Sequence, residues 1–133
     1  MSDEVETLVR APAPSVWLDA EEAIRQLRGG AEGYVEMCRI FLQEAQHWEA
    51  QLREAQLRGL PAPDREDFIA VLHEVTNALP IVGAKVAGQS LRQMEYALRE
   101  DDRLPVEPTL QAVLDTIVGV SEALKLQISQ LRA

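Results

Sequence analysis

The sequence predicts an all-α fold, an antiparallel four-helix bundle with a short additional helix at its N-terminal end. Apolar residues recur at alternating steps of three and four along four long segments. No segment alternates apolar and polar residues as a half-buried strand does. Short polar connections join the segments, as between antiparallel neighbours in a bundle. Residues 1–16, which include the run APAPS, are expected to form a flexible tail, and residues 17–133 to form the bundle.

The first two helices are bounded by capping and glycine signals. Asp19 to Glu22 reads Asp-Ala-Glu-Glu, a capping-box pattern that begins a short helix, and Gly29 and Gly30 end it. The first long helix is expected over about residues 32–58, before the helix-breaking run 59–63. Its predicted buried stripe is Tyr34, Cys38, Phe41, Ala45, Trp48, Leu52 and Ala55.

The second long helix is expected to begin at the cap Asp64. Its predicted stripe is Phe68, Leu72, Val75, Leu79 and Val82. Pro80 cannot donate a hydrogen bond to the carbonyl of Thr76, so a kink is expected in the last turns.

Two more helices follow Gly83, separated by a polar turn at 101–108. The first is expected to bury Ala87, Leu91, Met94 and Leu98. The second is expected to bury Leu110, Leu114, Ile117, Ser121, Leu124, Ile128 and Leu131.

Composition and charge narrow the classes of function. Thirteen Lys and Arg against 22 Asp and Glu give a net charge of −9, which argues against a nucleic-acid partner. Cys38 is the single cysteine, so no disulfide forms within the chain, and its place in the stripe predicts a packing residue rather than a nucleophile. No apolar run approaches the roughly 20 residues of a membrane span, and the N-terminus lacks a signal-peptide pattern. We therefore expect a cytoplasmic monomer without a membrane partner.

Metal and nucleotide chemistry find little support in the sequence. Glu44 and His47 have the Glu-x-x-His spacing of di-iron bundles, but no second copy exists on another helix. A glycine-rich phosphate loop is also absent from the sequence, which argues against ATP binding and kinase activity. We expect no cofactor and no metal on this chain.

His73 is the candidate for chemistry. It directly follows the stripe residue Leu72, so its ring is expected to point about 100° away from the centre of the stripe. Ile69, Ala70, Thr76 and Asn77 lie three or four residues away and are expected to share its exposed strip, open to a broad partner surface. Ile69, Ala70 and Asn77 are the candidate docking residues. The simplest interpretation of a lone surface histidine is nevertheless that it has no function.

A longer pattern around His73 is similar to a known family. Residues 72–84 (LHEVTNALPIVGA) resemble the phosphorylated helix of histidine-containing phosphotransfer (HPt) domains, which typically reads His-x-x-Lys-Gly-Ser-x-x-x-x-Gly-Ala. Residues 18–30 resemble the first helix of that family, 34–42 the start of the second, and 91–99 the fourth, so the likeness covers about residues 18–100. Thr76, Asn77 and Ala78 replace the family's Lys, Gly and Ser.

The resemblance implies a phosphorelay protein and roles for His73 and Glu95. His73 would accept a phosphoryl group from the aspartate of a response-regulator receiver domain or a hybrid sensor histidine kinase. Glu95 would orient its ring. Thr76 offers a hydroxyl but no charge, and Arg99, one turn beyond Glu95, could supply the positive charge instead. Mg²⁺ would belong to the receiver domain, and the chain would be a phosphocarrier rather than an enzyme.

Other interpretations stay open. The loss of the family's Lys and Gly favours a degenerate bundle that docks receiver or kinase domains without carrying phosphate. A helical adaptor or dimerisation module outside phosphorelay is a third interpretation. For Glu95 and Arg99 the alternative is an exposed i,i+4 ion pair without a role in chemistry.

Overall fold

The structure is a computed structural model that describes residues 18–59 and 62–131, and all secondary structure in these ranges is helical. The expected tail at 1–16 lies outside the described residues. The elements are α2 (Ala20–Gln26), α3 (Gly30–Arg58), α4 (Ala62–Ala78), the 3₁₀ turn η2 (Leu79–Val82), α5 (Lys85–Glu100) and α6 (Glu107–Leu131).

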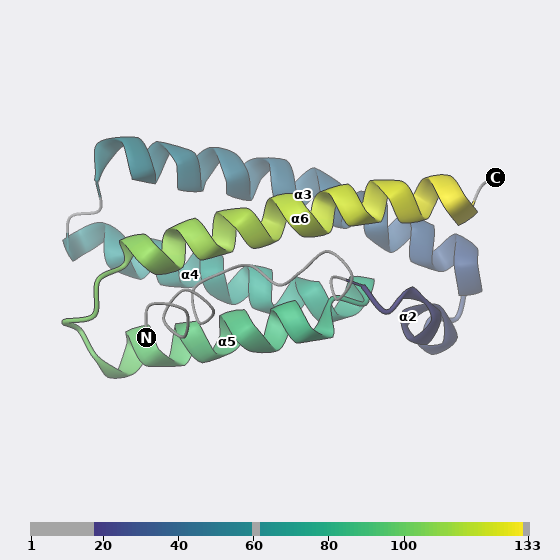
Figure 1. Ribbon diagram of the computed structural model, residues 1–133, viewed down its shortest axis with the longest axis horizontal. Helices are drawn as coiled ribbons and strands as arrows, with labels where there is room; N and C mark the ends of the chain where they lie inside the picture. The colour runs from purple at the N-terminus through teal and green to yellow at the C-terminus, as the bar shows by residue number, and fades with distance from the viewer. Residues whose placement is uncertain (1–17, 60–61, 132–133) are drawn as a thin grey trace, which may run out of the picture.

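The four long helices run lengthwise through the molecule in two pairs. Helix α3 lies along α6, and α4 lies along α5 (Figure 1). The short helix α2 sits at the end where α3 and α5 begin, and it contacts α3 and η2. The all-helical fold expected from the sequence, including its short first helix, is confirmed.

The core consists of the apolar faces of these helices. The buried residues of α3 are those of the predicted stripe: Tyr34, Cys38, Phe41, Ala45, Trp48, Leu52 and Ala55. The predicted stripe of α4 and η2 is also buried throughout: Phe68, Leu72, Val75, Leu79 and Val82. Burial at this spacing follows from the 3.6-residue turn, which returns every third or fourth side chain to one face.

Pro80 ends α4 instead of kinking it, so the expected kink is wrong. The α-helical hydrogen bonds stop at Ala78, and residues 79–82 continue as a tighter 3₁₀ turn. The reason is that Pro80 has no N–H to donate, and its ring would collide with the preceding turn of a continuing α-helix. The hydroxyl of Tyr34 donates a hydrogen bond to the carbonyl of Val82 at 2.8 Å, which ties this turn to α3.

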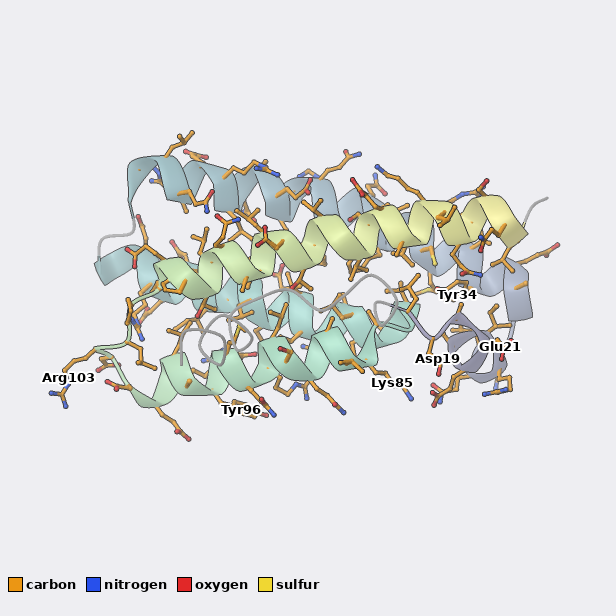
Figure 2. All side chains as sticks on the ribbon, viewed as in Figure 1. Asp19, Glu21, Tyr34, Lys85, Tyr96 and Arg103 are labelled. Atoms are coloured by element: carbon orange, nitrogen blue, oxygen red, sulfur yellow. The ribbon has the colours of Figure 1, made fainter. Side chains whose placement is uncertain are left out.

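Helix α2 is fastened to the turn that leads into α5. The backbone N–H of Asp19 donates to the carbonyl of Gly83 at 2.8 Å, and its carboxylate accepts from the N–H of Glu22 at 3.3 Å. The expected cap at Asp19 is therefore present. The carboxylate of Glu22 pairs with Lys85 at 2.5 Å instead of returning to the cap, which links α2 to α5 (Figure 2 labels Asp19 and Lys85 at this end).

Expectations for four further residues need correction. Asp64 lies within the first turn of α4, which begins at Ala62, so it is not the cap. Met94 on α5 is half-buried instead of buried. On α6, Ile128 is half-buried and Leu131 is 36% exposed, because the stripe leaves the core after Leu124. No helix among the described residues is long and apolar enough to cross a membrane.

Candidate functional site

His73 lies on the outside of α4 with its side chain 55% exposed. Its neighbours Leu72 and Val75 are fully buried, so the helical period turns the ring outward between them. The exposed position expected from the sequence is confirmed.

A buried carboxylate from α5 holds the ring. Glu95 is 2% exposed, and its Oε2 lies 2.9 Å from His73 Nδ1. Nε and Nη2 of Arg99, one turn along α5, each lie 2.9 Å from the same oxygen. The three side chains are therefore brought together as expected. The alternative interpretation of Glu95 and Arg99 as an exposed ion pair is wrong, because the carboxylate of Glu95 is buried.

Glu95 is ionised near neutral pH. Burial alone would raise its pKa, but hydrogen bonds from Arg99 and His73, together with the positive charge of Arg99, outweigh burial, so the pKa lies below its ordinary value of 4.5. An ionised carboxylate only accepts hydrogen bonds, so the contact with His73 requires the proton to be on Nδ1. The lone pair of the neutral ring is then on Nε2.

Asn77 and Arg92 complete the arrangement on the Nε2 side. The amide nitrogen of Asn77 lies 3.2 Å from His73 Nε2, and Nη2 of Arg92 lies 3.3 Å from the amide oxygen of Asn77. The guanidinium can only donate, so it fixes the amide with its oxygen toward Arg92 and its NH₂ toward Nε2. Both ring nitrogens thus have partners that agree on one tautomer.

Thr76 does not share the exposed strip, and this expectation is wrong. The residue is fully buried, and its hydroxyl lies 2.8 Å from the carbonyl oxygen of His73 and 3.3 Å from Oε1 of Glu95. A hydroxyl carries one proton, so it donates to one of these acceptors at a time. Thr76 therefore contacts the carboxylate that supports the ring, and it cannot reach a group bound to Nε2.

The docking residues expected from the sequence are only partly exposed. Ala70 and Asn77 lie on the surface, but Ile69 is 9% exposed and packs in the core, so its expected place on the exposed strip is wrong. A depression between α4 and α5 extends from Ile69 and Ala70 toward the α5–α6 connection. Its lining residues are Arg65, Glu66, Ile69, Ala70, Leu98, Arg99 and Asp102.

An apolar groove lies on the opposite side of α4, against α3. Glu74, the residue after His73, accepts a hydrogen bond from the indole of Trp48 at 3.1 Å. The groove beside this contact presents Ile40 and Ile81, each 47% exposed. Exposed apolar side chains grouped in a groove are typical of a protein-binding surface.

Two arginines near the site are not among the residues that the sequence singles out. Arg92 lies three residues before Glu95, a spacing that places it on the same face of α5 and could have indicated it. Arg65 lies one turn before Ile69 on α4, and its guanidinium donates to the carbonyls of Leu98, Asp101 and Leu104 at 2.9, 2.8 and 2.6 Å. Arg65 therefore connects α4 to the end of α5 and to the connection that follows it.

The remaining candidates form no cluster. His47 and Glu44 lie on the exposed side of α3, and no group of three or more His, Cys, Asp or Glu side chains in the described part of the chain could hold a metal ion. Cys38 is fully buried, and burial raises the pKa of its thiol to about 11, so it is a poor nucleophile.

Comparison with protein-family models, with curated proteins and with solved structures finds no match.

Proposed function

We propose that this chain is a histidine phosphotransfer protein, an antiparallel four-helix bundle in which His73 relays a phosphoryl group between receiver-domain aspartates. The observation that carries the proposal is the exposed imidazole whose Nδ1 is held, at 2.9 Å, by a buried and ionised carboxylate from the neighbouring helix. A solvent-exposed histidine without a function would not require a buried charge beside it, because burial of a carboxylate is unfavourable unless it is paired.

The arrangement suits nucleophilic attack by Nε2. Its lone pair forms the N–P bond, the bond from phosphorus to the donor aspartate breaks, and that electron pair leaves on the carboxylate. The ring keeps its proton on Nδ1 and becomes positively charged. Glu95 stabilises this charge through the hydrogen bond that it already makes, so little reorganisation is needed.

The surroundings of His73 suit a protein donor. Arg92 and Arg99 give a positive environment on a chain whose net charge is −9, and a receiver's active site is expected to be acidic. The exposed Ile40 and Ile81 offer apolar contact area on the other side of α4. The partners would be response-regulator receiver domains and hybrid sensor histidine kinases, with Mg²⁺ in the receiver's pocket. The chain would act as a cytoplasmic, monomeric phosphocarrier without kinase activity.

One observation favours a second candidate, a bundle that docks these partners without carrying phosphate. Asn77 stands where the HPt pattern has glycine, and its amide occupies the lone pair of Nε2. The family's lysine is also replaced, by the buried Thr76. Capture of receiver domains without phosphoryl transfer would support this candidate.

Transfer to His73 can be tested directly. The chain is mixed with a panel of receiver domains carrying ³²P-labelled phosphoaspartate, and label that is acid-labile but alkali-stable is measured on the chain. We expect such label on the native protein and none on His73→Gln. His47→Gln is the matched control, because His47 is the other histidine and is exposed on α3. No label from any receiver, or equal label on His73→Gln, would contradict the proposal.

A further inference from the structure

The amide of Asn77 lies where a phosphoryl group on Nε2 would have to form. Its nitrogen is 3.2 Å from Nε2 and donates to the lone pair that would attack phosphorus. Asn77 is four residues after His73, so both side chains lie on one face of α4 and the contact is a local one. An exposed hydrogen bond of this kind is weak because water competes for both groups, so it opens readily.

Transfer to Nε2 converts this lone pair into the N–P bond. The amide can then no longer donate to the nitrogen, but phosphoryl oxygens, which are strong acceptors, take the lone pair's place. A small rotation of the Asn77 side chain would redirect its N–H to one of these oxygens. Arg92, already 3.3 Å from the amide oxygen, would then lie beside the new negative charge.

We propose that Asn77 and Arg92 form the subsite for the phosphoryl oxygens on His73, an inference that rests on the function proposed above. Asn77 supplies a neutral donor from α4, and Arg92 supplies the positive charge from α5. Together they replace the lysine that the HPt pattern places three residues after the histidine.

The other polar groups nearby are committed elsewhere. Thr76 is buried against Glu95, on the Nδ1 side of the ring. Arg99 donates twice to Glu95 on that same side. Arg65 donates to three backbone carbonyls at the end of α5. The guanidinium of Arg92 is hydrogen-bonded to a neutral amide, so its charge is available to an anion on Nε2.

The subsite is tested on protein labelled at His73, by ³¹P NMR across a pH series. The midpoint at which the phosphoryl group loses its last proton reports on nearby positive charge and donors. We expect Arg92→Ala and Asn77→Ala to raise this midpoint by about half a pH unit, because both remove stabilisation of the dianion. Arg92→Lys, which retains the charge, should restore at least half of the shift.

The controls separate this inference from the function on which it rests. Arg103→Ala removes a guanidinium that is 97% exposed at the end of the molecule opposite α2, and should leave the midpoint unchanged (Figure 2). If His73 is phosphorylated but the pH midpoint of its phosphoryl group is the same in Arg92→Ala, Asn77→Ala and the native protein, the subsite alone is overturned. If the native protein takes up no label from any receiver, both proposals are overturned. All these side chains are exposed, so the variants are expected to fold.

Discussion

The carboxylate of Glu95 lies beneath the ring of His73, with Oε2 2.9 Å from Nδ1. One residue is buried and the other is half-exposed, so the pair spans the boundary between the protein interior and solvent. A hydrogen bond in this position can fix the orientation of the ring while leaving Nε2 accessible from outside. Glu95 is therefore expected to affect both the chemistry at His73 and the stability of the fold.

Replacement of Glu95 should slow phosphoryl transfer. Glu95→Gln keeps the size of the side chain but removes the negative charge that stabilises the ring as the N–P bond forms. We expect label uptake at His73 to slow by about tenfold, the effect of losing a hydrogen bond to a charged group. Glu100→Gln, an exposed change on the same helix, is the control. Equal uptake by Glu95→Gln and the native protein would remove Glu95 from the mechanism.

The stabilising effect of Glu95 should depend on pH with a definite sign. Its folded-state pKa lies below 4.5, so the ionised carboxylate stabilises the fold fully above that pH. The stabilisation is lost as the pH falls through the lowered pKa. In urea denaturation at several pH values, we expect the gap in unfolding free energy between native protein and Glu95→Gln to shrink below pH 4.5. A gap that stays constant, or widens in acid, would contradict this assignment.

Arg65 should stabilise the end of α5. Its guanidinium donates to the carbonyl of Leu98, which has no helical partner in the last turn of α5, and to the carbonyls of Asp101 and Leu104 in the connection that follows. We expect Arg65→Ala to lower the free energy of unfolding by about 1–3 kcal/mol. Arg65→Lys should recover only part, because an ammonium lacks the planar fork that reaches several carbonyls.

Hydrogen exchange gives a local check on Arg65. The amides of residues 101–106 should exchange faster in Arg65→Ala than in the native protein. Arg103→Ala removes an equal charge from the α5–α6 connection itself but none of these hydrogen bonds, and should leave both stability and exchange nearly unchanged. Identical behaviour of the two variants would show that Arg65 acts only through its charge.

Two glycines with positive φ should respond differently to substitution by alanine. Gly83 has φ +90°, and a Cβ there would lie 2.7 Å from the carbonyl oxygen of Asp19, whereas Gly59 has φ +74° with no atom within 4 Å of its Cβ position. Gly59 combines this φ with a ψ of 161°, a conformation that side chains rarely adopt, so Gly59→Ala should lose about 1–3 kcal/mol of stability through backbone strain alone.

Gly83→Ala should lose more, because the new methyl group forces Asp19 away and disrupts its 2.8 Å hydrogen bond to the carbonyl of Gly83. We expect its unfolding midpoint in urea to fall below that of Gly59→Ala. Equal losses would mean that α2 can shift without a penalty.

Cys38 should be inert in the folded protein. Its thiol is fully buried on α3, and burial raises its pKa to about 11, so the reactive thiolate is scarce at neutral pH. A thiol reagent such as DTNB should react slowly with the native protein and at once after unfolding in urea. Rapid, complete reaction of the native protein would contradict the burial of this side chain.

Much of the helical framework can be predicted from the sequence because its causes are local. The stripe of α3 and the stripe that runs from Phe68 to Val82 are set by the spacing of apolar residues over one or two turns. The ends of α3 and α4 follow from Gly59 and Pro80 for the same reason, but the expected end of the first helix at Gly29 and Gly30 is wrong, since α2 already ends at Gln26 and Gly30 begins α3. The effect of Pro80 on the helix is harder to predict. A kink and a 3₁₀ ending both accommodate a residue without an N–H, and the neighbouring residues do not decide between them.

The exposed position of His73 also follows from its place beside Leu72. Its partner Glu95 can be named from a family resemblance, and Arg99 from its place one turn beyond Glu95. Three features of the site cannot be predicted from the sequence: the burial of Thr76, the burial of Ile69, and the contact from Arg92 through Asn77 to Nε2 of His73. These depend on how α4 and α5 are rotated about their own axes where they pack. That rotation is decided by the whole core, because every buried side chain along both helices has to fit at once, and no short stretch of sequence contains this information.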